Sequence, residues 1–99
     1  MRVFFKPSNR KDKKLMAIFT DDDKTEIINI VHFGAKNMSD FTQHGDEQRK
    51  QNFLNRFNKL IKKNKNNKMS PMTLSHLILW NKESLEDSIE DYKKRFNLN

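Results

Sequence analysis

Cysteine is absent from this chain of 99 residues, and glycine and proline occur only twice each. Without cysteine there is neither a disulfide framework nor a thiolate metal site, the features that stabilise many small secreted domains. Two glycines are too few for a glycine-rich phosphate loop, so Gly34, which is followed by Ala35 and Lys36, is more typical of a turn. The composition therefore favours an intracellular protein that is not secreted.

Long apolar runs are also missing. Between Met1 and Lys14 the only apolar patch is Val3–Phe5, which is too short for a signal-peptide core or a membrane span. We therefore expect no membrane partner. At this length one hydrophobic core is the normal solution, so residues 1–99 should form a single domain in which eight phenylalanines supply much of the buried area.

Acidic residues are absent between Glu47 and Glu83, in a chain whose 20 lysines and arginines outnumber its 13 acids. A net charge of +7 on a small domain raises the local concentration of polyanions, of which nucleic acid is the commonest in a cell. The predicted nucleic-acid-binding residues all lie in this window: Arg49, Lys50, Arg56, Lys59, Lys62, Lys63, Lys65 and Lys68. The N-terminal cations would extend that surface: Arg2, Lys6, Arg10, Lys11, Lys13 and Lys14.

Other interpretations of this charge remain open. An A+T-rich genome produces many lysine and asparagine codons, and the basic segment would then be only a solvated helix face. An acidic protein surface is an alternative partner to nucleic acid. The acids lie mainly at 21–23 and 83–91, so the charge is bipolar, which also permits head-to-tail self-association.

The first third of the chain predicts three strands, over 2–6, 15–20 and 25–33. The polar segment 21–24 should connect the last two strands as a hairpin, and Gly34 should end the third. Both side-chain phases of the third strand are apolar, with Val31 in one and Ile30 in the other. That pattern is typical of a strand covered on both faces, so we expect the third strand to be central.

Three helices are expected after the strands, over 46–63, 71–81 and 85–96. Asp46, Ser70 and Ser84 are suitable N-caps for them. The helix over 71–81 is apolar on most sides and should be the buried one. The first helix carries an apolar stripe predicted to face the core: Phe53, Leu54, Phe57, Leu60 and Ile61.

The helices over 46–63 and 71–81 are separated by the asparagine- and lysine-rich segment 64–69. This segment has little to bury, and we expect a flexible loop. The order of elements predicts an α+β fold, a three-stranded antiparallel sheet followed by three helices.

Two stretches of the chain carry motifs that match a known family in order and density. The first runs from His32 to Asp46 and contains HFGAK and SDFT; the second runs from Ser70 to Leu98 and contains PMT, LWNK and SIEDYKKRF. Together they resemble a family of small basic proteins encoded by nucleocytoplasmic large DNA viruses, the giant and algal-virus group. The resemblance implies a virus-encoded protein of the virion or of the viral factory in the host cytoplasm, and it implies no reaction. This chain departs from the family at 64–69, where an Arg/His-rich stretch is usual.

Candidate catalytic and metal-binding residues are few. His32, Asp40, His44 and Asp46 show no compact ligand spacing such as a pair at i and i+4, and a histidine at a strand end is more often structural. Adding Ser39 does not make a hydrolytic triad, because neither a strained nucleophile turn nor an oxyanion loop accompanies it. We therefore predict no catalytic residue, no metal site and no cofactor.

Aromatic side chains are the remaining candidates for a binding role. Exposed rings stack on nucleobases, and Phe4, Phe5, Phe33 and Phe41 would do so if they were at the surface, although most of them should be core residues. Trp80 is expected to be a core anchor whose indole N–H bonds to a carbonyl. The sequence thus favours a non-enzymatic protein that binds DNA or RNA through phosphates without reading sequence. The alternative is a structural or adaptor protein of the virion.

Overall fold

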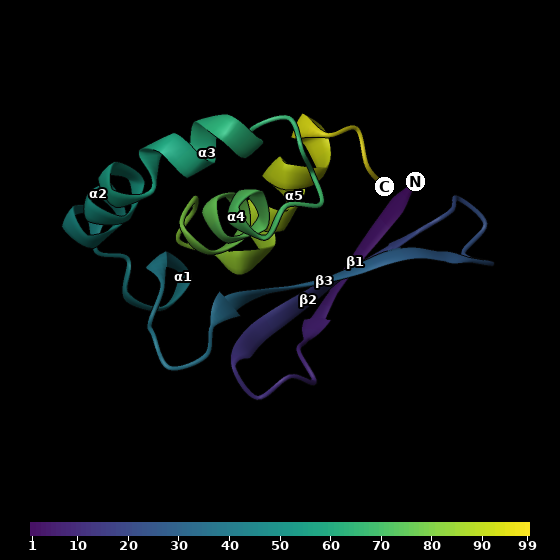
Figure 1. The fold of residues 1–99 in the computed structure, drawn as a ribbon, viewed down its shortest axis with the longest axis horizontal. Coiled ribbons are helices and arrows are strands. Elements are labelled where there is room, and N and C mark those ends of the chain that lie inside the picture. Colours follow the sequence, from purple (N-terminus) through teal and green to yellow (C-terminus); the bar gives the residue numbers. More distant parts are fainter.

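The strands form one block at the start of the chain and the helices form a second block after it (Figure 1). The computed structural model describes all 99 residues. The strands are β1 (Arg2–Pro7), β2 (Lys13–Thr20) and β3 (Ile27–Ala35). The helical elements are α1 (Phe41–His44), α2 (Glu47–Arg56), α3 (Asn58–Asn64), α4 (Pro71–Leu74), the π-helical segment η1 (Ser75–Leu79) and α5 (Leu85–Arg95). An antiparallel three-stranded sheet followed by helices confirms the predicted α+β class.

The sheet has the order β1-β2-β3, so the expectation that the third strand is central is wrong. Hairpin-like connections join β2 to both neighbours, which places β2 between them. The register aligns Phe4 with Ile18 and Ile18 with Ile30, so these three side chains share one face of the sheet. Strand β3 carries apolar residues on both of its faces, but only one face is covered, because Ile30 is 42% exposed.

All helices cover the same face of the sheet, and the other face carries no element of the chain (Figure 1). The covered face contributes buried residues from every strand: Val3, Ala17, Phe19, Val31 and Phe33. The uncovered face and the start of β3 present apolar side chains to solvent, among them Ile27, Ile28 and Ile30. None of the helices combines the length and apolar character that crossing a lipid bilayer requires.

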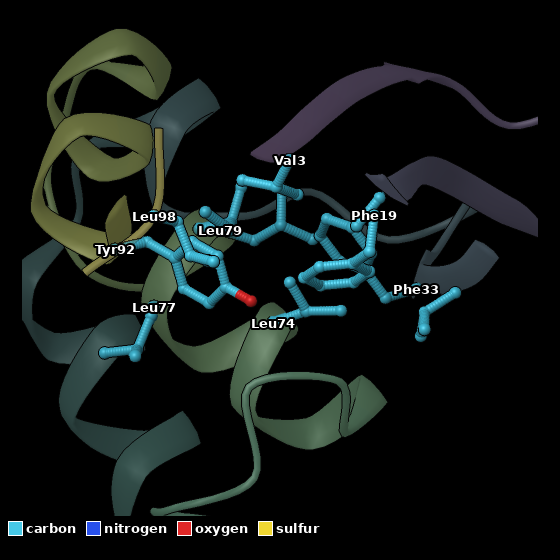
Figure 2. Packing of buried hydrophobic residues seen from close by; sticks show 11 residues of the cluster. Val3, Phe19, Phe33, Leu74, Leu77, Leu79, Tyr92 and Leu98 are labelled. Carbon is cyan, nitrogen blue, oxygen red and sulfur yellow. The ribbon is translucent and has the colours of Figure 1, made fainter. Parts of the chain in front are cut away.

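The core forms where α4, η1 and α5 meet the covered face of the sheet (Figure 2). Ser70 caps α4 by accepting from the Met72 N–H, and Pro71 occupies the first helical position, where its missing N–H costs nothing. The helix predicted over 71–81 is indeed the buried one, but it changes from α to π at Ser75. Its buried apolar residues are Leu74, Leu77, Ile78 and Leu79.

The helix predicted over 46–63 is broken at Phe57 into α2 and α3. Asp46 caps α2 as expected, accepting from the Gln48 and Arg49 N–H groups. The predicted core stripe of this helix is not buried: α2 and α3 contain no buried residue, and Leu60 is 47% exposed. In Figure 1 α3 lies on the side of α4 away from the sheet and α2 lies beside α4, beyond the end of β3, so neither helix packs directly on the covered face.

The connectors are more structured than the sequence indicates. Asp40 caps the short helix α1, which falls in the stretch expected to be a connector. The segment 64–69 has no regular structure beyond Asn64, but the Tyr92 hydroxyl donates to the Lys68 carbonyl and the Thr73 hydroxyl to the Asn64 carbonyl. Its predicted flexibility stays a prediction.

Replacing Gly34 by alanine should destabilise the fold more than the same change at Gly45. Both glycines have positive φ, +80° at Gly34 and +62° at Gly45. A Cβ at Gly34 would lie only 2.6 Å from Cδ1 of the buried Leu79, whereas at Gly45 the nearest atom, of Glu83, is 3.5 Å away. We expect Gly45→Ala to cost about 1 kcal/mol from the backbone alone, and Gly34→Ala about 2–4 kcal/mol. Urea unfolding of the two variants tests this, and equal losses would contradict it.

Tyr92 should make the protein less stable at high pH. Its side chain is fully buried, and burial raises the pKa of the phenol above its ordinary value. Above about pH 10 the unfolded chain loses the phenolic proton while the folded chain keeps it, so the free energy of unfolding falls as pH rises. Tyr92 is the single tyrosine, so tyrosinate absorbance should appear only as the protein unfolds.

Tyr92→Phe is the control for that prediction, because lysines also titrate at high pH. The variant should lose about 1 kcal/mol at neutral pH with the hydrogen bond to Lys68, and its stability should fall less steeply above pH 10 than that of the wild type. Tyrosinate absorbance that develops near pH 10 in the folded wild type would show that the phenol is not protected.

Candidate functional site

A cavity of about 500 Å³ opens between the sheet and the outer helices. Its walls come from the ends of β2 and β3, from the connector 38–40, from α2 and Phe57, and from the α4-η1 segment with Trp80. These elements are far apart in the sequence. Pockets of this volume are the usual size for small-molecule and nucleotide sites.

Stacked aromatic rings form the apolar part of the wall. The Phe53 and Trp80 rings are parallel within 6°, with centroids 4.6 Å apart, and Phe57 lies 4.9 Å from Phe53. All three rings are half-buried, in contrast to Phe33, which lines the cavity but is only 1% exposed. The cavity therefore offers aromatic surface that the core has not enclosed.

Four cations line the same cavity: Lys13, Lys14, Arg49 and Arg56. Arg49 and Arg56 are seven residues apart on α2, which puts them on one helix face with Phe53 between them. The Arg56 guanidinium carbon lies 5.2 Å from the centroid of the Phe57 ring, a cation–π distance. Lys13, Arg49 and Arg56 have no carboxylate within ion-pair distance.

Lys14 differs from the other three because its charge is compensated. Its Nζ lies 2.6 Å from Oδ2 of Asp40 and 2.9 Å from Oε1 of Gln43, and both carboxylate and ammonium are largely withdrawn from solvent. Asp40 also accepts from the Thr42 N–H and hydroxyl as the N-cap of α1. This pair fixes α1 to β2, and three unpaired cations are left at the cavity.

The structure places the predicted nucleic-acid-binding residues in different environments. Arg49 and Arg56 line the cavity. Lys50 does not face solvent freely, because its Nζ donates to the Asn81 carbonyl at 2.7 Å and lies 4.8 Å from the Phe41 ring centroid. Lys68 is half-buried. The remaining four are exposed on α3 and just beyond it: Lys59, Lys62, Lys63 and Lys65.

None of the cations between Glu47 and Glu83 forms an ion pair. The C-terminal acids form no ion pair with them. Asp91, for example, accepts from Arg95 on its own helix and from the Asn81 carboxamide. Hydrogen bonds to Arg95 and Asn81 hold the pKa of Asp91 below its ordinary value, in spite of its partial burial. The middle of the chain thus keeps its positive charge in the folded protein.

The polar residues weighed as metal or catalytic candidates have local structural partners. Asp40 and Asp46 are N-caps, His32 Nδ1 is 2.7 Å from the Ser8 hydroxyl, and His44 Nδ1 accepts from the Asp46 N–H. No group of three or more His, Asp or Glu side chains comes together in a way that could hold a metal ion.

The aromatic residues considered for base stacking differ in burial. Phe33 and Phe41 are buried, and Phe5 packs edge-on against Tyr92. Trp80 packs against the core as predicted, but it is only half-buried, it lines the cavity, and the predicted hydrogen bond from its indole N–H to a carbonyl is absent. Apart from Phe33, the rings at the cavity are Trp80 and two residues of the stripe that was predicted to face the core, Phe53 and Phe57.

Comparison with known proteins gives a single assignment. No curated protein and no solved structure matches the chain. Residues 3–57, which cover the sheet, α1 and α2 and therefore all four cavity cations, match DUF5754, a family of unknown function. Since the match covers more than half of the chain, the protein belongs to the DUF5754 family.

Proposed function

We propose that this protein is a non-enzymatic polyanion-binding protein whose ligand is nucleic acid, held through its phosphates. The observation that carries the proposal is the absence of any ion pair among the cations between Glu47 and Glu83. These cations have no carboxylate partner and most of them are exposed, so they are available for an external anion.

The arrangement of these cations supports contact with several phosphates at once. Lys13, Arg49 and Arg56 surround the cavity, and α3 continues from α2 with exposed lysines at 59, 62 and 63. Each neutralised phosphate releases a counterion and contributes about 0.9 to the salt slope on duplex DNA. Three to six contacts correspond to a slope of about −3 to −5. Contacts to phosphates carry no sequence information, so binding should be independent of sequence.

The resemblance to proteins of large DNA viruses supports a location where viral DNA is handled. We therefore propose that the protein acts in the viral factory of the host cytoplasm or inside the virion. DNA is the expected ligand there, and RNA the competitor.

A second candidate function is that of a structural or adaptor protein of the virion. The observation that favours it is the uncovered face of the sheet, where Phe4, Ile18 and Ile30 form a cross-strand apolar row beside Ile28. Purification from infected cells separates the two functions. Partners removed by nuclease support nucleic-acid binding, and stoichiometric partners that survive nuclease support the adaptor.

Neutralising Arg49 and Arg56 should weaken DNA binding and its salt dependence. For Arg49→Gln/Arg56→Gln we expect about a ten-fold loss of affinity for a random-sequence duplex at moderate salt and a salt slope smaller by about 2. Fluorescence anisotropy across a salt series measures both quantities. Neither side chain is buried or ion-paired, so the variant should fold normally.

Lys24→Gln/Lys94→Gln is the matched control, because it removes the same charge from exposed positions in the β2–β3 turn and on α5, outside the predicted binding surface. It should change affinity by less than the cavity variant and leave the slope nearly unchanged. Wild-type affinity that does not vary between low and moderate salt would overturn the proposal. Equal losses in the two variants would show that net charge, and not this surface, drives binding.

A further inference from the structure

We propose that the cavity holds an unpaired nucleobase, so that the nucleic acid this protein prefers is single-stranded. The inference rests on the proposed function and adds to it the substrate class. A surface that only tracks phosphates needs no hollow, yet here the unpaired cations surround one.

The shape of the site favours a base that has left the stack. A duplex presents a convex backbone with its bases stacked inside, and a concave pocket cannot reach them. Bases of a single strand can turn outward and insert into such a pocket. A cavity of about 500 Å³ between α2 and the sheet is large enough for a nucleobase and much too small for a helix of DNA.

The wall of the cavity has the chemistry that a base requires. Phe53 and Trp80 are stacked on each other and half-buried, and Phe57 continues the aromatic surface. Aromatic rings with accessible area are the common stacking platforms of single-strand-binding proteins, and they tolerate any base because every base has a π-face. Asn52 and Ser75 lie among these rings and offer polar groups to a base edge.

Backbone geometry keeps this aromatic surface in place. The π-helical turn Ser75–Leu79 brings Ser75, Leu79 and Trp80 to the cavity, and π-helical turns occur frequently at functional sites. Gly34, at the end of β3, lies so close to Leu79 that a Cβ at this position would collide with the Leu79 side chain. The packing of Gly34 against Leu79 therefore fixes this part of the cavity wall, and the connector 38–40 supplies another part.

A nucleic-acid strand and a free nucleotide both contain a base joined to a phosphate. The positions of the cations distinguish between these two ligands. Lys13, Arg49 and Arg56 at the cavity can contact the phosphates next to an inserted base. Unpaired lysines continue beyond the cavity along α3, at 59, 62 and 63, where a mononucleotide would have nothing to contact them. This extension favours an oligonucleotide.

The experiment compares four probes by anisotropy at fixed salt: single-stranded oligo-dT, a duplex of equal length, an abasic oligonucleotide of equal length, and thymidine monophosphate. We expect oligo-dT to bind at least about five-fold more tightly than the duplex or the abasic strand, and the mononucleotide to bind weakly or not at all. Trp80 is the single tryptophan, so oligo-dT should quench its fluorescence and the abasic strand should not.

A variant of the cavity wall locates the effect. Phe53→Leu keeps an apolar side chain and removes the ring, so oligo-dT affinity should fall about five-fold or more while duplex affinity stays the same. Phe4→Leu is the control, since Phe4 is a half-buried ring on the uncovered face of the sheet. Thermal unfolding shows whether each variant folds, and the wild-type comparison of oligo-dT with the abasic strand needs no variant.

The outcomes separate this inference from the proposed function. Equal affinity for oligo-dT, abasic strand and duplex, with a normal salt slope, would overturn the base pocket and leave polyanion binding intact. Mononucleotide binding as tight as that of oligo-dT would overturn the strand as ligand. If none of the polymers binds at low salt, the proposed function itself fails.

Discussion

The burial of the α4-η1 segment against one face of the sheet is the constraint on which the rest of the structure depends. Leu74 and Leu79 lie beside Phe19 and Phe33 in the core cluster, to which α5 adds Tyr92 (Figure 2), and Ile78 belongs to the same cluster. The opposite face of the sheet carries no element of the chain, so the covered face is the one place where a helix joins the core. Once it is filled, α2 and α3 have no core position left and pack on the outside, with their aromatic side chains half-exposed.

The cavity is a consequence of this competition for a small core. The apolar stripe on α2 and α3 meets Trp80 and α4 instead of the sheet. Phe53 stacks on Trp80, and the space between α2 and the end of β3 stays open. Surface rings next to an opening are available for a ligand in a way that core rings such as Phe33 are not.

The cations near the cavity keep their charge uncompensated because several acids already have local partners. Asp40 caps α1 and pairs with Lys14, Asp46 caps α2, and Asp91 pairs with Arg95 on α5. Carboxylates engaged in this way cannot reach across to Arg49, Arg56 or the lysines of α3. The cations between Glu47 and Glu83 thus remain without carboxylate partners, which is what the proposed anionic ligand requires.

Local signals in the sequence determined the strands, the α+β order, the N-caps at Asp46, Ser70 and Ser84, and the buried character of Leu74–Leu79, because each depends on residues within a few positions of one another. The acid-free window also predicted Arg49 and Arg56 as binding residues, and the structure leaves both without an ion pair. Only the tertiary structure decided that β2 and not β3 is central, that Phe53 and Trp80 border a cavity, and that Lys13 lies across from α2. These features depend on which apolar segment occupies the single covered face of the sheet, and that outcome is set by packing between distant parts of the chain, which periodicity and composition do not encode.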